Sequence, residues 1–184
     1  MPNSRVRVRA WCEDRGHERF VRDVLKHRYN LGRRDVDVKP APRGLGSASQ
    51  WVIAAYPEVV RQMRAARKQA NLGFLVVVDG DSVGLVARLR SLCGQPNRRA
   101  STDRLAIWVP TWNIETWVLW LCGCQVKGHN VDEQSSYKGS IKQSDFGSLS
   151  AQAAAKWEPP LQAEPTSVPS LAAARVELTL LPLP

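Results

Sequence analysis

The chain has 184 residues, of which 43% are hydrophobic and 23% are charged. These values are typical of a globular protein with one sizeable core, so we do not expect a disordered chain. Its apolar runs are too short to span a bilayer and none near the N-terminus has signal-peptide character, so we expect a cytoplasmic protein with no membrane partner. The net charge of +9 is uneven, because the residues through Arg104 carry +11 and the rest carry −2.

The first part of the chain predicts two strands with a helix between them. Residues 5–13 alternate charged and apolar side chains, which is typical of a strand near a sheet edge, and Glu13 stands at its end. Residues 17–29 place four apolar side chains on one stripe at helical spacing, which predicts a helix packed against the sheet. Residues 35–39 alternate again before two prolines, so we expect a short second strand there.

The middle of the chain predicts a long helix followed by a buried strand. The helix is expected from about 49 to 70, with Ser47 or Ser49 as its N-cap. Residues 73–78 form a continuous apolar run, which is typical of a central parallel strand buried on both faces. This strand leads directly into the sequence Asp-Gly-Asp at 79–81.

The alternation of strands and helices continues with a helix expected over 83–93 and a strand over 105–109. This order predicts an α/β fold, namely a Rossmann-like parallel sheet of about four strands flanked by helices. Ligands of such sheets bind beyond the carboxyl ends of the strands. Glu13 and the 79–81 motif are both expected at those ends.

The C-terminal third predicts helices, a polar loop and a proline-rich tail. Trp117 and Trp120 belong to an apolar helix that we expect to pack in the core. The composition turns polar from about 127, and the tail after about 148 is helical and interrupted by prolines. We therefore expect one domain over 1–125 and an extension over 126–184 that docks on the core or on a partner.

Asp79 and Asp81 are the strongest candidates for a functional site. Two carboxylates on a tight turn, with Gly80 between them permitting an unusual backbone angle, can bind one hard cation such as Mg²⁺ or Mn²⁺. The alternative is that both aspartates cap the helix expected from Val83. Glu13 favours the metal site, because it ends another strand that can neighbour theirs in the sheet.

These residues resemble the motifs of a known family. A glutamate ending the first strand, in Trp-Cys-Glu-Asp at 11–14, and an Asp-x-Asp ending a later buried strand, in Val-Val-Asp-Gly-Asp-Ser at 77–82, are similar to those of the Toprim domain of topoisomerases, primases and overcoming-lysogenization-defect type nucleases. The resemblance covers residues 5 to about 125 and is greatest to small stand-alone Toprim proteins, several of which look like parts of antiviral defence systems. It implies that 1–125 is a catalytic domain.

Within this resemblance, Asp79 and Asp81 match the metal-binding pair, and Glu13 matches the glutamate that binds metal or acts as general acid and base. Lys138 and Lys142 resemble the late lysine that some Toprim nucleases use against transition-state charge, the alternative being solvated loop lysines.

Other residues near the same edge are candidates with simpler alternatives. Glu115 follows the fourth expected strand and is the only acid among apolar neighbours, so it binds a second cation or is a first-turn glutamate favoured by the helix dipole. Glu18 and His17 open the first helix and are weaker candidates, as a ligand and as a proton shuttle.

A basic surface around an acidic pocket suits a nucleic acid whose phosphates approach a metal, although basic charge can also serve only solubility. We therefore expect a Mg²⁺- or Mn²⁺-dependent nuclease, or another phosphodiester-processing enzyme, that acts on DNA or RNA. One alternative is a non-catalytic Toprim-like subunit that binds nucleic acid or a nucleotide within a larger complex. Another is a toxin-like effector that cleaves a structured RNA and is held inactive by a partner protein.

Overall fold

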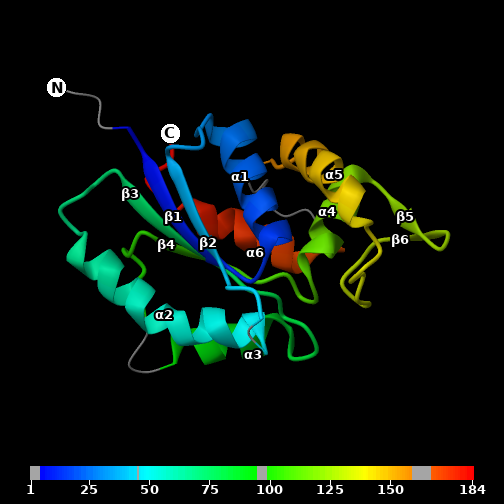
Figure 1. The fold of residues 1–184 in the computed structure, drawn as a ribbon, viewed down its shortest axis with the longest axis horizontal. Helices are drawn as coiled ribbons and strands as arrows, with labels where there is room; N and C mark the ends of the chain where they lie inside the picture. The colour runs from blue at the N-terminus through cyan, green and yellow to red at the C-terminus, as the bar shows by residue number, and fades with distance from the viewer. Residues whose placement is uncertain (1–4, 45, 95–98, 159–166) are drawn as a thin grey trace.

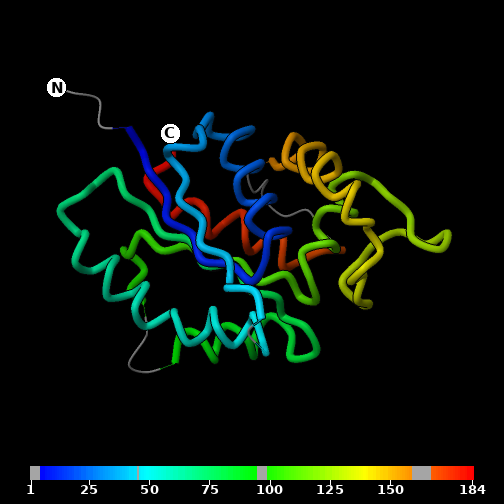
Figure 2. The backbone as a smooth tube through the Cα atoms, in the orientation of Figure 1, coloured from blue at the N-terminus to red at the C-terminus, as the bar shows by residue number. Residues whose placement is uncertain are grey.

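Four parallel strands form the larger sheet of the molecule, in the order β2-β1-β3-β4 (Figure 1, Figure 2). The computed structural model describes residues 5–44, 46–94, 99–158 and 167–184. The strands are β1 (Arg7–Cys12), β2 (Val36–Pro40), β3 (Leu72–Val77) and β4 (Leu105–Trp108). Each neighbouring pair is parallel, so the predicted α/β fold with a four-stranded parallel sheet is confirmed.

The first strand, expected near a sheet edge, is the second strand of the sheet, next to the edge strand β2. β1 lies between β2 and β3 and pairs with both of them. The alternation of charged and apolar residues follows from how the helices cover one face of this strand. Trp11 is buried on the face covered by α2 (Ala48–Ala65), whereas Arg7 and Arg9, which precede it on the same face, are exposed. On this face, helical cover therefore reaches only the carboxyl half of β1, whereas Val8 and Ala10 on the opposite face are buried.

Helices cover both faces of the sheet (Figure 1). On one face, α2 and α3 (Gly84–Cys93) bury their apolar side chains against those of β3, such as Phe74 and Val76. The opposite face packs against α1 (Arg15–Tyr29), α4 (Ile114–Cys122), α5 (Gln143–Ala155) and α6 (Pro169–Leu178). Because β3 is buried on both faces, its sequence is a continuous apolar run.

The C-terminal segment belongs to the same core as the sheet. Trp157, which follows α5, stacks on Trp108 of β4 with 4.9 Å between the ring centroids. Trp108 Nε1 also donates a hydrogen bond of 3.1 Å to the carbonyl oxygen of Ala174 in α6. The segment thus docks on the core. The three prolines of the expected linker, within 159–166, lie outside the described residues, and the domain boundary expected after residue 125 stays a prediction.

Local capping sets where the first two helices begin. Asp14 accepts a hydrogen bond from His17 N at the start of α1 (3.0 Å), and Ser47, one of the two expected caps, accepts from Gln50 N at the start of α2 (3.3 Å). α2 ends at Ala65 and not near 70, because the chain turns there toward β3. Among the described helices, none is both long enough and apolar enough to cross a membrane.

The polar segment after α4, expected to be a loop, contains a small antiparallel hairpin of β5 (Gln125–Val126) and β6 (His129–Asn130). Lys127 and Gly128 at its turn have positive φ angles of 51° and 79°. Two-residue hairpin turns often require such angles, because their twist then matches that of the strands.

Candidate functional site at the carboxyl edge of the sheet

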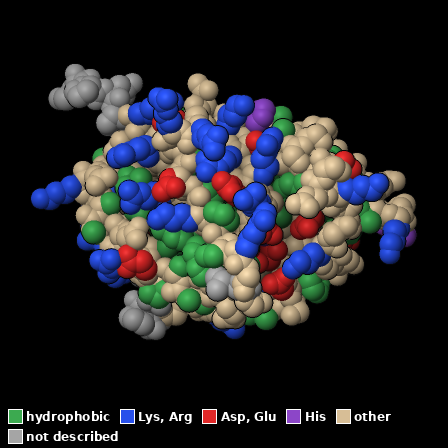
Figure 3. Space-filling view, viewed as in Figure 1, with side chains coloured by type: hydrophobic (Ala, Val, Ile, Leu, Met, Phe, Trp, Pro, Cys, Tyr) green, Lys and Arg blue, Asp and Glu red, His purple; other side chains and the backbone are tan. Residues whose placement is uncertain are grey.

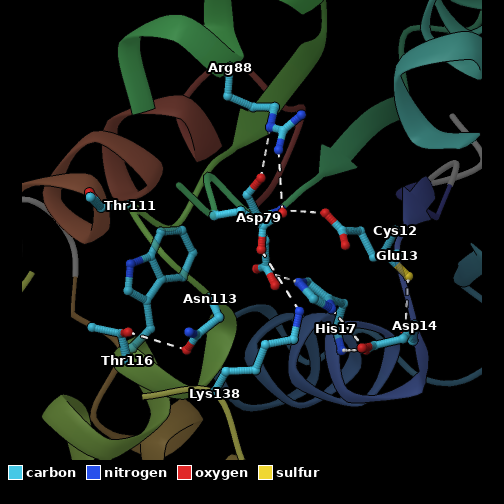
Figure 4. Close-up of polar contacts among 12 residues, drawn as sticks. Cys12, Glu13, Asp14, His17, Asp79, Arg88, Thr111, Asn113, Thr116 and Lys138 are labelled. Atoms are coloured by element: carbon cyan, nitrogen blue, oxygen red, sulfur yellow. Dashed lines mark hydrogen bonds and ion pairs between the residues drawn. The ribbon is translucent and has the colours of Figure 1, made fainter. Parts of the chain in front are cut away.

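The carboxyl edge of the sheet brings two of the expected site residues, Glu13 and Asp79, into contact. Glu13 follows β1, and Asp79 lies two residues after β3, the neighbouring strand. Glu13 Oε1 accepts a hydrogen bond of 2.7 Å from the backbone nitrogen of Asp79 (Figure 4). Their exposed fractions are only 8% and 3%. The two side chains form a buried acidic pair at the edge where parallel sheets bind ligands.

A histidine joins this acidic pair from the first turn of α1 (Figure 4). His17 is almost fully buried, with Nε2 2.8 Å from Oδ1 of Asp79 and Nδ1 2.8 Å from Oδ1 of Asp14. Burial alone would lower the pKa of His17, but the negative charge of Asp79 and the hydrogen bonds to both aspartates outweigh burial and raise it well above its usual value. Both ring nitrogens of His17 lie at hydrogen-bond distance from carboxylate oxygens, which favours the imidazolium form with a proton on each nitrogen.

Two further cations face the Asp-Gly-Asp turn. Arg88 of α3 donates from Nε to the carbonyl oxygen of Asp79 (2.8 Å) and from Nη2 to Oδ2 of Asp81 (3.4 Å). Lys138 lies with Nζ 3.8 Å from Oδ1 of Asp81, so this expected residue does reach the turn. The aspartates do not cap α3, because Val83 is its N-cap and no side chain makes a capping hydrogen bond there.

Gly80 is required by the close approach of two backbone segments. Its nitrogen donates to the carbonyl oxygen of Pro110 (2.8 Å), and a Cβ added to it would lie 2.2 Å from the carbonyl oxygen of Thr111. The unusual backbone angle expected at Gly80 is found one residue later, since Asp81 has the positive φ (47°). The β4–α4 connection therefore packs directly against the turn that carries the aspartates.

Glu115 lies at the same edge, in the first turn of α4. Burial, and to a lesser extent the negative charge of Asp79, raise the pKa of Glu115 above its usual value. The side-chain amide of Asn113 links Glu115 to Lys138. In the orientation that satisfies both partners, the amide nitrogen donates to Oε2 of Glu115 (3.2 Å), and the amide oxygen accepts from the backbone nitrogen of Lys138 (3.1 Å). Glu115 is thus within electrostatic reach of Asp79 and is linked to the Lys138 segment.

Two weaker candidates have other contacts or positions. Glu18 forms an ion pair with Arg22, with 3.0 Å between Oε1 and Nε. Such pairs between residues four apart are common along exposed helix faces. Lys142 is exposed at the N-cap position of α5, without a capping hydrogen bond from its side chain.

Sequence reasoning missed Arg88 and undervalued His17. Both carry a positional signal, because His17 opens the helix that follows Glu13, and Arg88 lies in the second turn of the helix that follows Asp81. Helices that begin at the carboxyl edge point their first turns toward it. Cations in those turns are therefore natural partners for acidic side chains at the strand ends.

The raised pKa of Glu13 leads to a prediction about stability. Burial first, and the charge of Asp79 second, raise this pKa from 4.5 to about 7. Between those pH values the folded protein binds the proton that the unfolded chain releases, so stability falls as pH rises through this window. In metal-free buffer, Glu13→Gln should be about 3 kcal/mol more stable than the parent above the window and no more stable below it. Urea unfolding of both proteins across pH measures this; a difference that is constant with pH would contradict it.

The carboxylate oxygens at this edge are of the kind that hard metal cations prefer as ligands. Basic side chains of the protein already contact them. Carboxylate oxygens such as those of Glu13, Asp79 and Asp81 are typical ligands of Mg²⁺ and Mn²⁺. Across the ranges that the structure describes, however, no group of three or more His, Cys, Asp or Glu side chains is arranged so that it could hold a metal ion. His17 contacts Asp79, and Arg88 contacts Asp81. The magnesium site therefore stays a prediction.

Comparisons of this chain with protein-family models, with curated proteins and with solved structures found no match.

Proposed function

We propose that this protein is a Toprim-like, Mg²⁺- or Mn²⁺-dependent enzyme that cleaves or otherwise processes phosphodiester bonds of DNA or RNA. The domain over 1–125 would carry the chemistry. The protein would act in the cytoplasm, and the resemblance to small stand-alone Toprim proteins supports a place in antiviral defence beside a protein partner.

The buried hydrogen bond that joins the Glu13 carboxylate to the backbone nitrogen of Asp79 carries this proposal, because it holds the two acidic residues side by side. Two buried carboxylates at the ends of neighbouring parallel strands repel each other, and the charge of Asp79 contributes to the raised pKa of Glu13. Strongly shifted carboxyl groups concentrate at functional sites, where a bound cation or substrate relieves the repulsion. Asp81, which is partly exposed, adds a third carboxylate on the side from which a phosphate can approach.

Each expected residue has a role in this proposal. Asp79, Asp81 and Glu13 would hold one cation, and Glu115 would hold a second. A bound divalent ion supplies positive charge where a phosphate develops negative charge. Lys138, whose side chain is 69% exposed, would contact the phosphate oxygens directly.

His17 and Arg88 would act as positioning residues. His17 holds the Asp79 carboxylate from one side, and Arg88 ties the carbonyl of Asp79 to α3. Both are buried, so they fix the geometry of the turn and do not reach substrate.

A second candidate function is a non-catalytic subunit that binds nucleic acid or a nucleotide in a larger complex. One observation favours it: His17, Arg88 and Lys138 already neutralise the aspartates, as in an acidic cluster that is purely structural. In that case the basic surface alone would bind the ligand.

One experiment separates these functions. Purified protein is incubated with plasmid DNA, single-stranded DNA and structured RNA in Mg²⁺, in Mn²⁺ or in EDTA. Cleavage that requires the metal supports the enzyme. Tight binding of the same nucleic acids without turnover in either metal supports the subunit.

Binding to nucleic acid should weaken steeply with salt. The chain carries a net charge of +9, and Lys and Arg side chains are spread over the face seen in Figure 3, while several acidic ones gather right of its centre. Neutralising six or more phosphates would lower affinity about a thousandfold between roughly 50 and 200 mM salt, because counterions are released on binding. Fluorescence anisotropy of a labelled strand measures the slope. A flat salt response would point to a small ligand or a protein partner.

Glu115→Gln tests the second cation. The substitution keeps the shape of the side chain and removes its charge, so folding should be unchanged while cleavage or metal affinity falls about tenfold or more. Cleavage rates across a magnesium titration measure both quantities. Glu18→Gln is a matched control, because it also changes a first-turn glutamate, and it should behave like the parent. If Glu115→Gln cleaves like the parent throughout the titration, only a single-ion site is left.

A further inference from the structure

A cavity of about 540 Å³ opens beside the acidic pair. Its walls come from the start of α1, the connection between β2 and α2, the first turn of α4, and α5 with the segment that precedes it. Two of its lining residues also belong to the site. Asp14 contacts His17, and Glu115 lies within electrostatic reach of Asp79. The cavity therefore adjoins the carboxyl edge of the sheet.

Three kinds of chemistry meet in the lining of this cavity. The ring of Phe146 lies over the start of α1, where a Cβ added to Gly16 would be 3.4 Å from a ring carbon, and Ile141 adds apolar surface. Arg15 and Arg43 line the cavity and are exposed, so their guanidinium groups can meet an incoming anion. The carboxyl group of Glu115 offers hydrogen-bond acceptors.

A nucleotide presents matching chemistry. Its base is flat and stacks on aromatic side chains, its phosphate binds arginine, and its amino and hydroxyl groups donate to carboxylates. The cavity volume lies within the range of about 300 to 1,000 Å³ that is typical of small-molecule sites. Such a space can take one unstacked nucleotide, whereas a paired base inside a duplex cannot enter it without leaving the stack.

We propose that this cavity binds one unpaired nucleotide of a nucleic acid strand, with its base against Phe146 and its phosphate near Arg15 and Arg43. This inference rests on the proposed function, because it places the neighbouring phosphodiester at the carboxylates. The substrates are then single strands, or unpaired segments of structured molecules, and regular duplexes are poor ligands.

The test is a binding measurement in EDTA, so that it requires neither metal nor turnover. Fluorescence anisotropy compares a short labelled strand, as DNA and as RNA, with the duplex of the same sequence. The parent should bind the single strand at least about tenfold more tightly than the duplex. Phe146→Ala and Arg43→Ala should each weaken single-strand binding about tenfold, with little effect on the duplex. The two sugar types show which nucleic acid the cavity accepts.

Arg43 keeps the test decisive if Phe146→Ala folds poorly, because Arg43 is exposed and its loss does not open the core. Arg61→Ala is the matched control, since Arg61 is exposed on α2 and pairs there with Glu58. This variant should bind single strands like the parent, with at most a small loss from its charge. Equal affinity of the parent for strand and duplex would overturn the inference. Unchanged single-strand affinity in Arg43→Ala would do so as well.

Failure of the nucleotide-binding inference and failure of the proposed function give different results. If the parent binds single strands through Phe146 and Arg43 but cleaves nothing in Mg²⁺ or Mn²⁺, the inference holds and the enzyme proposal fails. If the parent cleaves duplex and single strand equally well and Phe146→Ala has no effect, the enzyme proposal holds and the inference fails.

Discussion

Asp79→Asn should abolish metal-dependent cleavage while the protein stays folded. The exchange keeps the shape of the side chain and an oxygen that His17 can contact, but it removes the charge that would attract a cation. The backbone contacts of residue 79 with Glu13 and Arg88 do not depend on the side chain. We expect the cleavage rate to fall at least about a hundredfold, as for the loss of a group required in the transition state. Initial rates across a magnesium series measure the loss, and circular dichroism checks the fold.

Asp37→Asn is the matched control for this experiment. Asp37 is exposed on β2, so the same chemical exchange there should leave the cleavage rate at the parent value. A rate near that of the parent in Asp79→Asn would exclude Asp79 from the chemistry and, with it, the cation site proposed for Glu13, Asp79 and Asp81.

Gly80→Ala should destabilise the protein by about 3 kcal/mol and lower its Tm by about 6 to 12 °C. The added Cβ would lie 2.2 Å from the carbonyl oxygen of Thr111 and 2.7 Å from that of Pro110, and neither backbone atom can move as a side chain could. The two segments must therefore separate. Because one of them carries Asp79 and Asp81, cleavage should fall together with stability. Thermal unfolding followed by circular dichroism gives the Tm.

Gly46→Ala provides the comparison. Among the described residues outside its chain neighbours, no atom lies within 4 Å of a Cβ added to Gly46, so this alanine should be neutral or slightly stabilising through the unfolded chain. A similar Tm for the two variants would show that the packing of the β4–α4 connection against residue 80 does not limit stability.

The order of the elements was predictable because periodicity is a local property of the chain. The apolar run over 73–78 and the helical stripe over 17–29 correspond to β3 and α1, with ends that differ by one or two residues. The place of a strand within the sheet is not local. Arg7 and Arg9 predict a strand near a sheet edge, and β1 is the second strand, but the pattern does not show which strands flank it. The two arginines are exposed because the helices that cover this face leave the start of β1 uncovered.

That Glu13 and Asp79 come close together was also predictable from the sequence. Parallel strands end at one edge of their sheet, so acidic residues at strand ends converge whenever the strands are neighbours. The contacts of these residues could not be predicted, since the sequence contains many arginines and does not indicate which one a carboxylate meets. Arg88 meets Asp81 only because α3 folds back along the sheet after the turn.

By itself the sequence determined the alternation of strands and helices, the buried strand before Asp79, and the acidic residues at the strand ends, because each depends on neighbours within a few positions. Only the tertiary structure decided that His17 bridges Asp14 and Asp79, and that the C-terminal helices close the core over β4. It also showed that Gly80 is needed for space and not for its backbone angle. These features depend on segments that are distant in sequence and come into contact only when the sheet is assembled.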